Sequence, residues 1–405
     1  MKKYLILFTV ISLIFLTEIS FAVTTSFSFK DLLYDPRAMG MAGAMTALAD
    51  SPTAAIFNPA LMGEYSNLDL KLGVGLAPLD ETNLENWQTL SEYIQALEQG
   101  EEPPDGESQA QLSFGGYLNL GISKLGITLF GDGDANADYY KYINPSSADQ
   151  LTETTAIDIS VNITGNANLN GAVTVAIPAI DILGVKLNIG ANLRVNDTVN
   201  LGTSVTAYAT NWGIAQTELT DTSNDNDYYR STYYLAEQRY LAVDAGAYLK
   251  FSPFISVGLV FKNAYATPLE GKITSSIEEG YFDTNGELVT TQSSETVGPF
   301  DVTLPELSTT AGVLLKVPVL DTRIAIDANL DSSFQPTLYR VGIEQPLFVL
   351  VGRGGAILDT NFQPMLYTFG AGIDLHIVKV DLGVVFEPED LTIPVAASVS
   401  GSIGF

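Results

Sequence analysis

The sequence has no cysteine and only one histidine among 405 residues. The lack of cysteine excludes disulfide bonds, thiolate metal sites and cysteine nucleophiles. Basic residues are also scarce, with 19 Lys and Arg against 47 Asp and Glu, and the formal net charge is −28. This acidity argues against nucleic acid as a partner, because the phosphate backbone attracts basic surfaces. After the N-terminus, no apolar run reaches the roughly 20 residues that a membrane-spanning helix needs.

The N-terminus has the order of a secretory signal. Two lysines precede the apolar stretch 4–16, and the small-residue segment Ser20-Phe21-Ala22 follows it. A charged start, a short apolar stretch and small residues before the cleavage point are typical of a signal peptide that is removed on export. We therefore expect residues 1–22 to be a signal peptide and the mature chain to begin at Val23.

The last eleven residues, Val395–Phe405, alternate between two kinds of side chain. Val395, Ala397, Val399, Ile403 and Phe405 share an apolar face, and the residues between them are small or polar. A period of two with unlike faces predicts a strand between two unlike environments. A terminal strand that ends in Phe405 also indicates a C-terminal signal for the barrel-assembly machinery.

The same alternation recurs from about residue 67 to the end of the chain. Without membrane-spanning helices, a closed barrel is the remaining structure that satisfies its backbone hydrogen bonds in lipid. We therefore predict an all-β fold, a transmembrane antiparallel β-barrel of about 14 strands over residues 67–405. Its outer surface would contact outer-membrane lipid.

Long connections alternate with short turns in this pattern, as outer-membrane barrels require. We expect long extracellular loops at 80–107, 139–153, 211–236 and 274–300. Leu84, Trp87, Leu90, Ile94 and Leu97 recur at helical spacing, so residues 83–98 are predicted to form a loop helix that begins at Asn83. The acidic loops are expected to be solvated, and the sequence leaves open whether a hard cation bridges them.

Parity assigns a set of polar residues to the barrel lumen, because each would be costly on the lipid-facing side. They are Asn188, Asn192, Arg194, Asp244, Lys250, Arg323, Asp327, Arg340, Glu344, Arg353, Asp374, Lys379 and Asp381. Their charges are of both signs. The sequence therefore leaves two interpretations open: a neutralised network that stiffens the wall, and a polar path or set of latches that holds an internal segment.

Residues 23–66, which we call the plug, do not alternate. They are rich in alanine, methionine and other small residues, and they contain Pro36, Pro52 and Pro59. A separate domain of this size would be marginally stable, whereas small side chains allow close packing in a narrow space. We therefore expect the plug to be a small helical insert inside the barrel.

The plug sequence resembles the N-terminal hatch of the FadL-type outer-membrane transporter superfamily. The motifs that carry this resemblance are Arg-Ala-x-Gly-Met-x-Gly-Ala at Arg37–Ala44 and Asn-Pro-Ala at Asn58–Ala60. The resemblance implies that Arg37, Gly40, Gly43, Asn58, Pro59 and Ala60 set the plug geometry. It also implies a kinked strand that opens the wall sideways, for which Gly131, Asp132 and Gly133 are the candidates because the alternation breaks there.

Catalysis is not expected. An outer-membrane hydrolase would need a histidine base, and the single histidine, His376, lies near the periplasmic end beside Asp374. The Gly40–Gly43 spacing does not follow a strand and lacks the Lys-Ser/Thr of a nucleotide-binding loop. No metal-ligand spacing is present either, so we expect no cofactor and no metal.

The resemblance implies passive uptake of hydrophobic, fatty-acid-like small molecules across the outer membrane. Two alternatives remain open. The same plug pattern occurs in PorV-like and TraF-like relatives, which act as assembly partners in secretion or conjugation, and such a protein could bind a protein partner at its extracellular loops. The third interpretation is a general diffusion porin whose N-terminal segment lies outside the lumen.

Overall fold

A computed structural model describes residues 32–404, with gaps at 33–34, 49–50, 52, 79–82, 84, 91, 93–105, 146–154, 211–227, 283–287 and 376. The predicted signal peptide, His376 and Phe405 therefore lie outside the described residues. The plug contains α3 (Pro36–Gly40), α4 (Ala54–Phe57) and the 3-10 helix η1 (Pro59–Glu64).

The rest of the described chain is a single antiparallel sheet of fifteen strands. The strands are β1 (Leu68–Ala77), β2 (Gly106–Ile122), β3 (Leu125–Pro145), β4 (Thr155–Ile182), β5 (Val185–Thr210), β6 (Tyr228–Ser252), β7 (Ile255–Phe282), β8 (Leu288–Pro299), β9 (Ser308–Val317), β10 (Thr322–Leu330), β11 (Pro336–Leu347), β12 (Leu350–Leu358), β13 (Pro364–Asp374), β14 (Val378–Phe386) and β15 (Ala396–Gly404).

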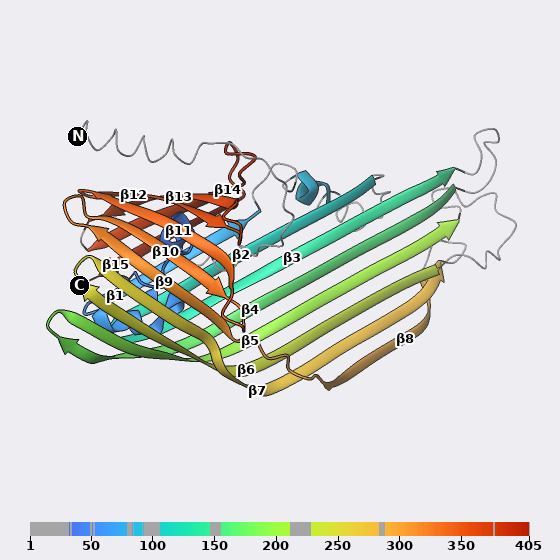
Figure 1. The fold of residues 1–405 in the computed structure, drawn as a ribbon. Coiled ribbons are helices and arrows are strands. Elements are labelled where there is room, and N and C mark those ends of the chain that lie inside the picture. Colours follow the sequence, from blue (N-terminus) through green and yellow to red (C-terminus); the bar gives the residue numbers. More distant parts are fainter. Residues whose placement is uncertain are drawn as a thin grey trace, which may run out of the picture.

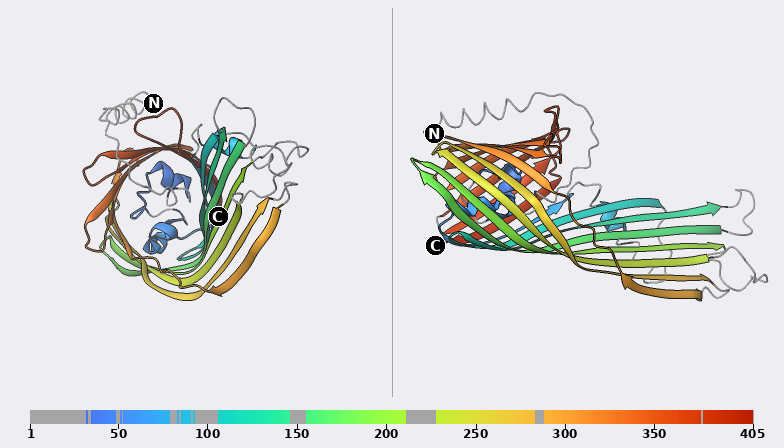
Figure 2. Two further views of the ribbon diagram at one scale, coloured as in Figure 1. Left: turned by 90° about the vertical axis from the view of Figure 1, so that its right-hand side faces the viewer. Right: turned by 60° about the horizontal axis from the view of Figure 1, so that its bottom comes forward.

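Fourteen of these strands form a closed ring, which Figure 2 shows from one end. β1 pairs with β15, and β6 pairs with β7, so both edges of the sheet are joined. β7 then pairs with β9 along its first residues and with β8 along its last. The predicted antiparallel barrel of about 14 strands is confirmed. Among the helices that the structure describes, none is long and apolar enough to cross a membrane.

The two faces of the sheet differ as the alternation predicted. On β1, Leu70, Leu72 and Val74 are exposed on the outside of the ring, whereas Lys71 between them is only 4% exposed. On β5, Ile189 and other apolar residues face outward in the same way. Strands of this kind expose an apolar band to hydrocarbon and keep polar groups inside.

The strands fall into a short group and a long group (Figure 1). β9 to β15 have 9–12 residues, close to the roughly 9–11 that a membrane-spanning strand needs. β4 and β7 have 28 residues each, or roughly 90 Å at about 3.3 Å per residue. The long strands therefore continue as a curved sheet well beyond the ring, and we call this part the extension.

The predicted loops at 139–153, 211–236 and 274–300 were wrong in part. β3 continues to Pro145, β6 begins at Tyr228, and the last of these segments contains the end of β7 and all of β8. In the extension both faces carry Thr, Asn, Ser and Tyr. Apolar and polar residues therefore no longer alternate there, although the backbone pairing between strands continues. Hydrophobic alternation reports where a strand meets hydrocarbon and not where the strand ends.

The predicted loop helix is described over part of its length, and residues 85–90 are helical. Leu90 is buried against Ala137 and Tyr139 on the outer face of β3. The side chain of Asn83 accepts a hydrogen bond from the Gln111 amide at 2.7 Å and donates one to its carbonyl at 2.6 Å. It thereby pairs with β2 beyond the end of β1, as a neighbouring strand would.

Candidate functional site

The described residues of the plug lie inside the ring, where Figure 2 shows their short helices enclosed by the strands. Met39, Met41, Met45, Leu61 and Met62 are all fully buried. The chain reaches this position through tight turns made by small residues. Packing of flexible methionine side chains lets the plug fill an irregular space.

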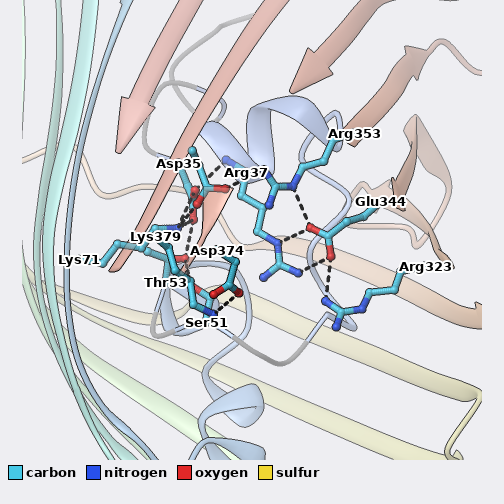
Figure 3. A network of polar contacts seen from close by, with 11 residues as sticks. Asp35, Arg37, Ser51, Thr53, Lys71, Arg323, Glu344, Arg353, Asp374 and Lys379 are labelled. Atoms are coloured by element: carbon cyan, nitrogen blue, oxygen red, sulfur yellow. Dashed lines mark hydrogen bonds and ion pairs between the residues drawn. The ribbon is translucent and has the colours of Figure 1, made fainter. Parts of the chain in front are cut away.

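An arginine of the plug, Arg37, binds a buried carboxylate on the wall, that of Glu344 (Figure 3). Arg37 donates to both oxygens of Glu344 on β11, at 2.7 and 2.8 Å. Arg323 from β10 and Arg353 from β12 donate to the same carboxylate, each at 2.8 Å. Glu344 is only 2% exposed. Arg353 also binds Asp381 at 2.8 Å, so the excess positive charge is shared with a second carboxylate.

A second ion pair joins the start of the plug to β1. The Asp35 carboxylate accepts hydrogen bonds from Lys71 at 3.0 and 3.1 Å and from the Thr53 hydroxyl at 2.5 Å. It also accepts one from the Arg37 amide, which caps α3. Burial alone raises the pKa of Asp35, but the Lys71 charge and these hydrogen bonds outweigh it and hold the pKa below its usual value. Asp35 is therefore ionised at neutral pH.

The glycines of the first plug motif allow close approach to the wall. Gly40 lies against Gly370 on β13, and a Cβ on Gly40 would lie 2.9 Å from the Gly370 Cα. Gly43 has a positive φ of 78°, which L side chains rarely adopt, and the Arg340 guanidinium lies next to it. Both positions thus require glycine for a local geometric reason.

The second plug motif makes a turn that touches the opposite wall. Asn58 caps η1 by accepting from the Ala60 amide at 3.1 Å, and Pro59 occupies the first helical position. The Asn58 side-chain amide also donates to the carbonyls of Thr46 and Ala247, at 2.9 and 3.1 Å. Proline fixes φ and the cap orients the turn, so this segment is held in one conformation.

Inward-facing glycines on eight strands provide the room that the plug occupies. They are Gly190, Gly246, Gly258, Gly312, Gly342, Gly355, Gly370 and Gly383, and a Cβ at any of them would come within 3.0 Å of a plug atom. At Gly258 it would overlap the Thr46 carbonyl oxygen. The wall and the plug backbone are therefore complementary in shape over much of the ring.

Most of the predicted lumen residues face inward, and several contact the plug. Asp327 accepts a hydrogen bond from the Thr46 amide at 2.9 Å, and Arg340 lies opposite Asp327 in the register of β10 and β11. Lys250 donates to Glu64 of η1 at 3.3 Å. The charged residues are thus used mainly as contacts between the wall and the plug.

Asp374 and Lys379 differ from the rest because they lie at the rim and are half exposed. They form an ion pair with each other at 2.9 Å. Asp374 is thereby paired with Lys379, whereas His376 is outside the described residues. Within the described residues, no cluster of His, Cys, Asp and Glu is arranged to hold a metal ion.

The candidate lateral opening at Gly131–Gly133 stays a prediction, but the structure has no bulge there. The pairing of β3 with β2 and with β4 continues through these residues with no change of register. Gly131 and Gly133 face outward, and the Phe114 ring from β2 lies over Gly133. Gly133 therefore makes room for a neighbouring aromatic side chain. Asp132 faces inward and accepts a hydrogen bond from Asn168 at 3.0 Å.

A cavity of about 340 Å³ lies between the plug and the long strands β3 to β7. The plug contributes Ala55 and Ile56. The wall contributes Thr128, Phe130, Asp132, Asn168, Asn170, Ala172, Thr174, Asn192, Arg194, Asn196, Tyr240, Asp244, Lys262 and Asn263. The ion network at Glu344 lies on the short-strand side of the ring. On the long-strand side the plug also contacts the wall, for example through Asn58 and Glu64, but leaves this cavity beside those contacts.

Arg194 and Asp244, both predicted for the lumen, meet at this cavity. Arg194 contacts Asp244 at 3.2 Å and also donates to Asn170 and Asn263. Asn263 has a positive φ of 56° and lies where β7 bulges relative to β6. Sequence reasoning missed Asn263 and Lys262, because the bulge shifts the alternation that assigned the other lumen residues.

Lys71 was also missed, although it is the wall partner of Asp35. It lies between Leu70 and Leu72 in a strand that otherwise has an unbroken apolar face. Parity alone places it on the inner side, next to the first residues of the plug. A charge on the inner face of the strand that directly follows the plug is the signal that could have identified it.

No family model and no curated protein matches this sequence. Solved structures do match in fold. The CymD monoaromatic hydrocarbon channel has 12% identity and a TM-score of 0.50, with 93% of this chain and 99% of that chain covered. A deletion mutant of the TodX monoaromatic hydrocarbon channel has 10% identity and a TM-score of 0.51, with 92% and 99% covered. The chain therefore shares its fold with these two channels.

The Arg37–Glu344 contact generates a first prediction. Arg37→Ala removes two charge-assisted hydrogen bonds and should weaken attachment of the plug by about 1.5–3 kcal/mol. We expect more frequent open-channel events in planar bilayers than for the unaltered protein. Arg323→Ala is the matched control, because it removes a contact to the same carboxylate from the wall and leaves the plug bound. Equal conductance of the two variants would contradict the assignment.

The wall glycines generate a second prediction. Gly258→Ala should displace the plug or strain the wall, at a cost of about 1–3 kcal/mol in the free energy of unfolding. Gly401→Ala on β15 should have little effect, since nothing lies within 4 Å of a Cβ there. Thermal unfolding of both variants in detergent measures the difference. A Gly258→Ala protein as stable as Gly401→Ala would show that the plug does not rest against β7.

Proposed function

We propose that this protein is a plugged outer-membrane channel of the FadL-type superfamily, through which a small molecule passes without an energy source. The observation that carries the proposal is the cavity between Ala55 and Ile56 of the plug and the wall strands β3 to β7. A solute in this space is separated from the far end of the ring only by the plug. Displacement of that segment would complete a path.

The apolar band of the ring supports a membrane location. Outward residues on β5 are apolar up to Val195, and the outward Asp197–Arg239 ion pair follows. We place this ion pair at the outer edge of the hydrocarbon, the extension outside the cell, and the Leu68 end of β1 with the Gly404 end of β15 on the periplasmic side. C-terminal recognition by the barrel-assembly machinery through Phe405 belongs to the same proposal.

Support for the solute class comes from the two similar structures, which are monoaromatic hydrocarbon channels. We therefore propose uptake of small hydrophobic or partly apolar compounds. Ile56, Phe130 and Ala172 give the cavity an apolar side that suits such a solute. Fatty-acid-like cargo, which the plug motif implies, is one member of this class.

A scaffold function is the second candidate, and the extension favours it. A wall that only spans lipid does not need strands of 28 residues. The extension offers a large surface outside the ring to which an extracellular protein partner could bind. This function would not depend on the cavity.

Deletion of Val23–Gly63 tests the plug. We expect the intact mature protein to conduct ions weakly in a planar bilayer and the deletion variant to conduct strongly, because the lumen is then unobstructed. The variant must first show the heat-dependent gel shift and the β-sheet spectrum of a folded barrel. Similar conductance of the two folded proteins would remove the plug from the mechanism.

A cavity-filling variant tests uptake. Ala172→Trp should reduce the initial rate of uptake of labelled toluene or laurate by intact cells several-fold, because the indole ring occupies the cavity. Ala167→Trp, on the outer face of the same strand, is the control and should leave the rate unchanged. If cells with and without the protein take up both compounds equally, transport is excluded for them and the scaffold function gains support.

A further inference from the structure

The charges that line the cavity are balanced. Arg194 and Lys262 contribute two positive charges, and Asp132 and Asp244 contribute two negative charges. An anionic ligand would gain from the first pair and be repelled by the second. The electrostatics of the cavity therefore favour a neutral occupant.

Two buried polar atoms at the cavity have no partner within the described residues. They are the Asn192 side-chain oxygen and the Thr174 hydroxyl, and these residues are 5% and 1% exposed. The Asn192 amide nitrogen is already used, since it donates to the Ala55 carbonyl at 3.0 Å. Buried polar groups are nearly always hydrogen-bonded, so these two atoms indicate a ligand with its own donors and acceptors.

The remaining polar groups require the same kind of ligand. The Lys262 ammonium makes no ion pair or hydrogen bond to other described side chains, although its charge acts on Asp244, and it can only donate. The Asn192 oxygen can only accept, whereas the Thr174 hydroxyl does both. A hydroxyl group both donates and accepts while neutral, so it matches all three. A pure hydrocarbon would leave every one of them unsatisfied.

The inner face of the extension continues this chemistry away from the cavity. Asn168 donates to Asn166 at 2.9 Å, Asn166 donates to Asn200 at 2.5 Å, and the Thr198 hydroxyl donates to Asn168 at 2.8 Å. The result is a row of amides and hydroxyls along β4 and β5 that leads to the cavity. Such a surface hydrogen-bonds hydroxylated molecules at each step.

We propose that the cavity binds a small neutral compound with several hydroxyl groups, of the size of a monosaccharide or cyclic polyol. Its hydroxyls contact Asn192, Thr174 and Lys262, and its C–H face lies against Ile56 and Phe130. The volume is near the lower end of the range for small-molecule sites, which excludes a polymer. The inference goes beyond the proposed function, because a polyol lies outside the hydrophobic solute class given there, and it rests on that function only for the passage of the solute.

The test is binding to the full-length mature protein in detergent, measured by calorimetry and saturation-transfer NMR. The probes are D-glucose, D-mannose and myo-inositol, with toluene and laurate for comparison. We expect at least one of the hydroxylated probes to bind with an affinity that is independent of ionic strength, because the ligand is neutral. Preferential binding of laurate or toluene, with no binding of the three hydroxylated probes, would overturn the proposal.

Thr174→Val is the diagnostic variant. The hydroxyl has no partner in the described protein, so its removal should not lower the unfolding temperature, yet it should weaken binding about threefold to tenfold. Thr164→Val, an exposed threonine on the same strand, is the matched control and should bind normally. Equal affinity of the two variants would count against the cavity as the site.

Binding and uptake separate this inference from the proposed function. Probe binding with no uptake by cells would leave the site in place and remove the channel. Uptake of toluene that Ala172→Trp blocks, with no binding of hydroxylated probes, would retain the channel and remove the inference.

Discussion

The arrangement of the lumen depends on the compensation of buried charge. Glu344 is surrounded by Arg37, Arg323 and Arg353, and one of these arginines belongs to the plug. With the plug in place little water reaches this carboxylate, so its partners must be protein groups. Directional contacts of this kind fix one orientation of the plug, whereas apolar packing alone would allow several orientations.

The short strands and the long strands of the ring contact the plug in different ways. The short strands bind the plug through the arginines around Glu344 and through close backbone contacts, and the long strands β5 to β7 also contact it through Lys250 and three glycines. The long strands β3 to β7 leave the cavity and continue into the extension. A solute path, if the proposed function holds, therefore lies on the side where the wall is tallest, and the amide row on β4 and β5 is its approach.

Much of the fold could be predicted from the sequence because each membrane strand lies between hydrocarbon and a polar interior. The same parity placed Arg194, Asp244 and Glu344 inside the ring. It failed for the extension, where both faces meet water and the pattern loses its contrast. Parity was also ambiguous at Gly133, because a residue without a side chain interrupts an apolar pattern whether it bends a strand or makes room for a neighbouring ring such as that of Phe114.

The candidate site was less predictable than the fold. The plug motif indicated that Arg37 and Asn58 matter but could not name their partners, which lie hundreds of residues away in the chain. The cavity combines five strands with the plug, and the bulge at Asn263 depends on pairing between β6 and β7. Such three-dimensional coincidences have no local sequence signal.

The glycines that face the plug have a consequence for the order of biogenesis. Plug atoms occupy the positions that side chains on these strands would otherwise fill. A closed barrel therefore has no free space through which a folded plug could enter. The ring is closed by β1 and β15, the most distant pair of strands in the chain. If the chain is exported as proposed, its N-terminal segment emerges first, so the plug must already be seated when this last seam joins, and the nascent sheet wraps around it.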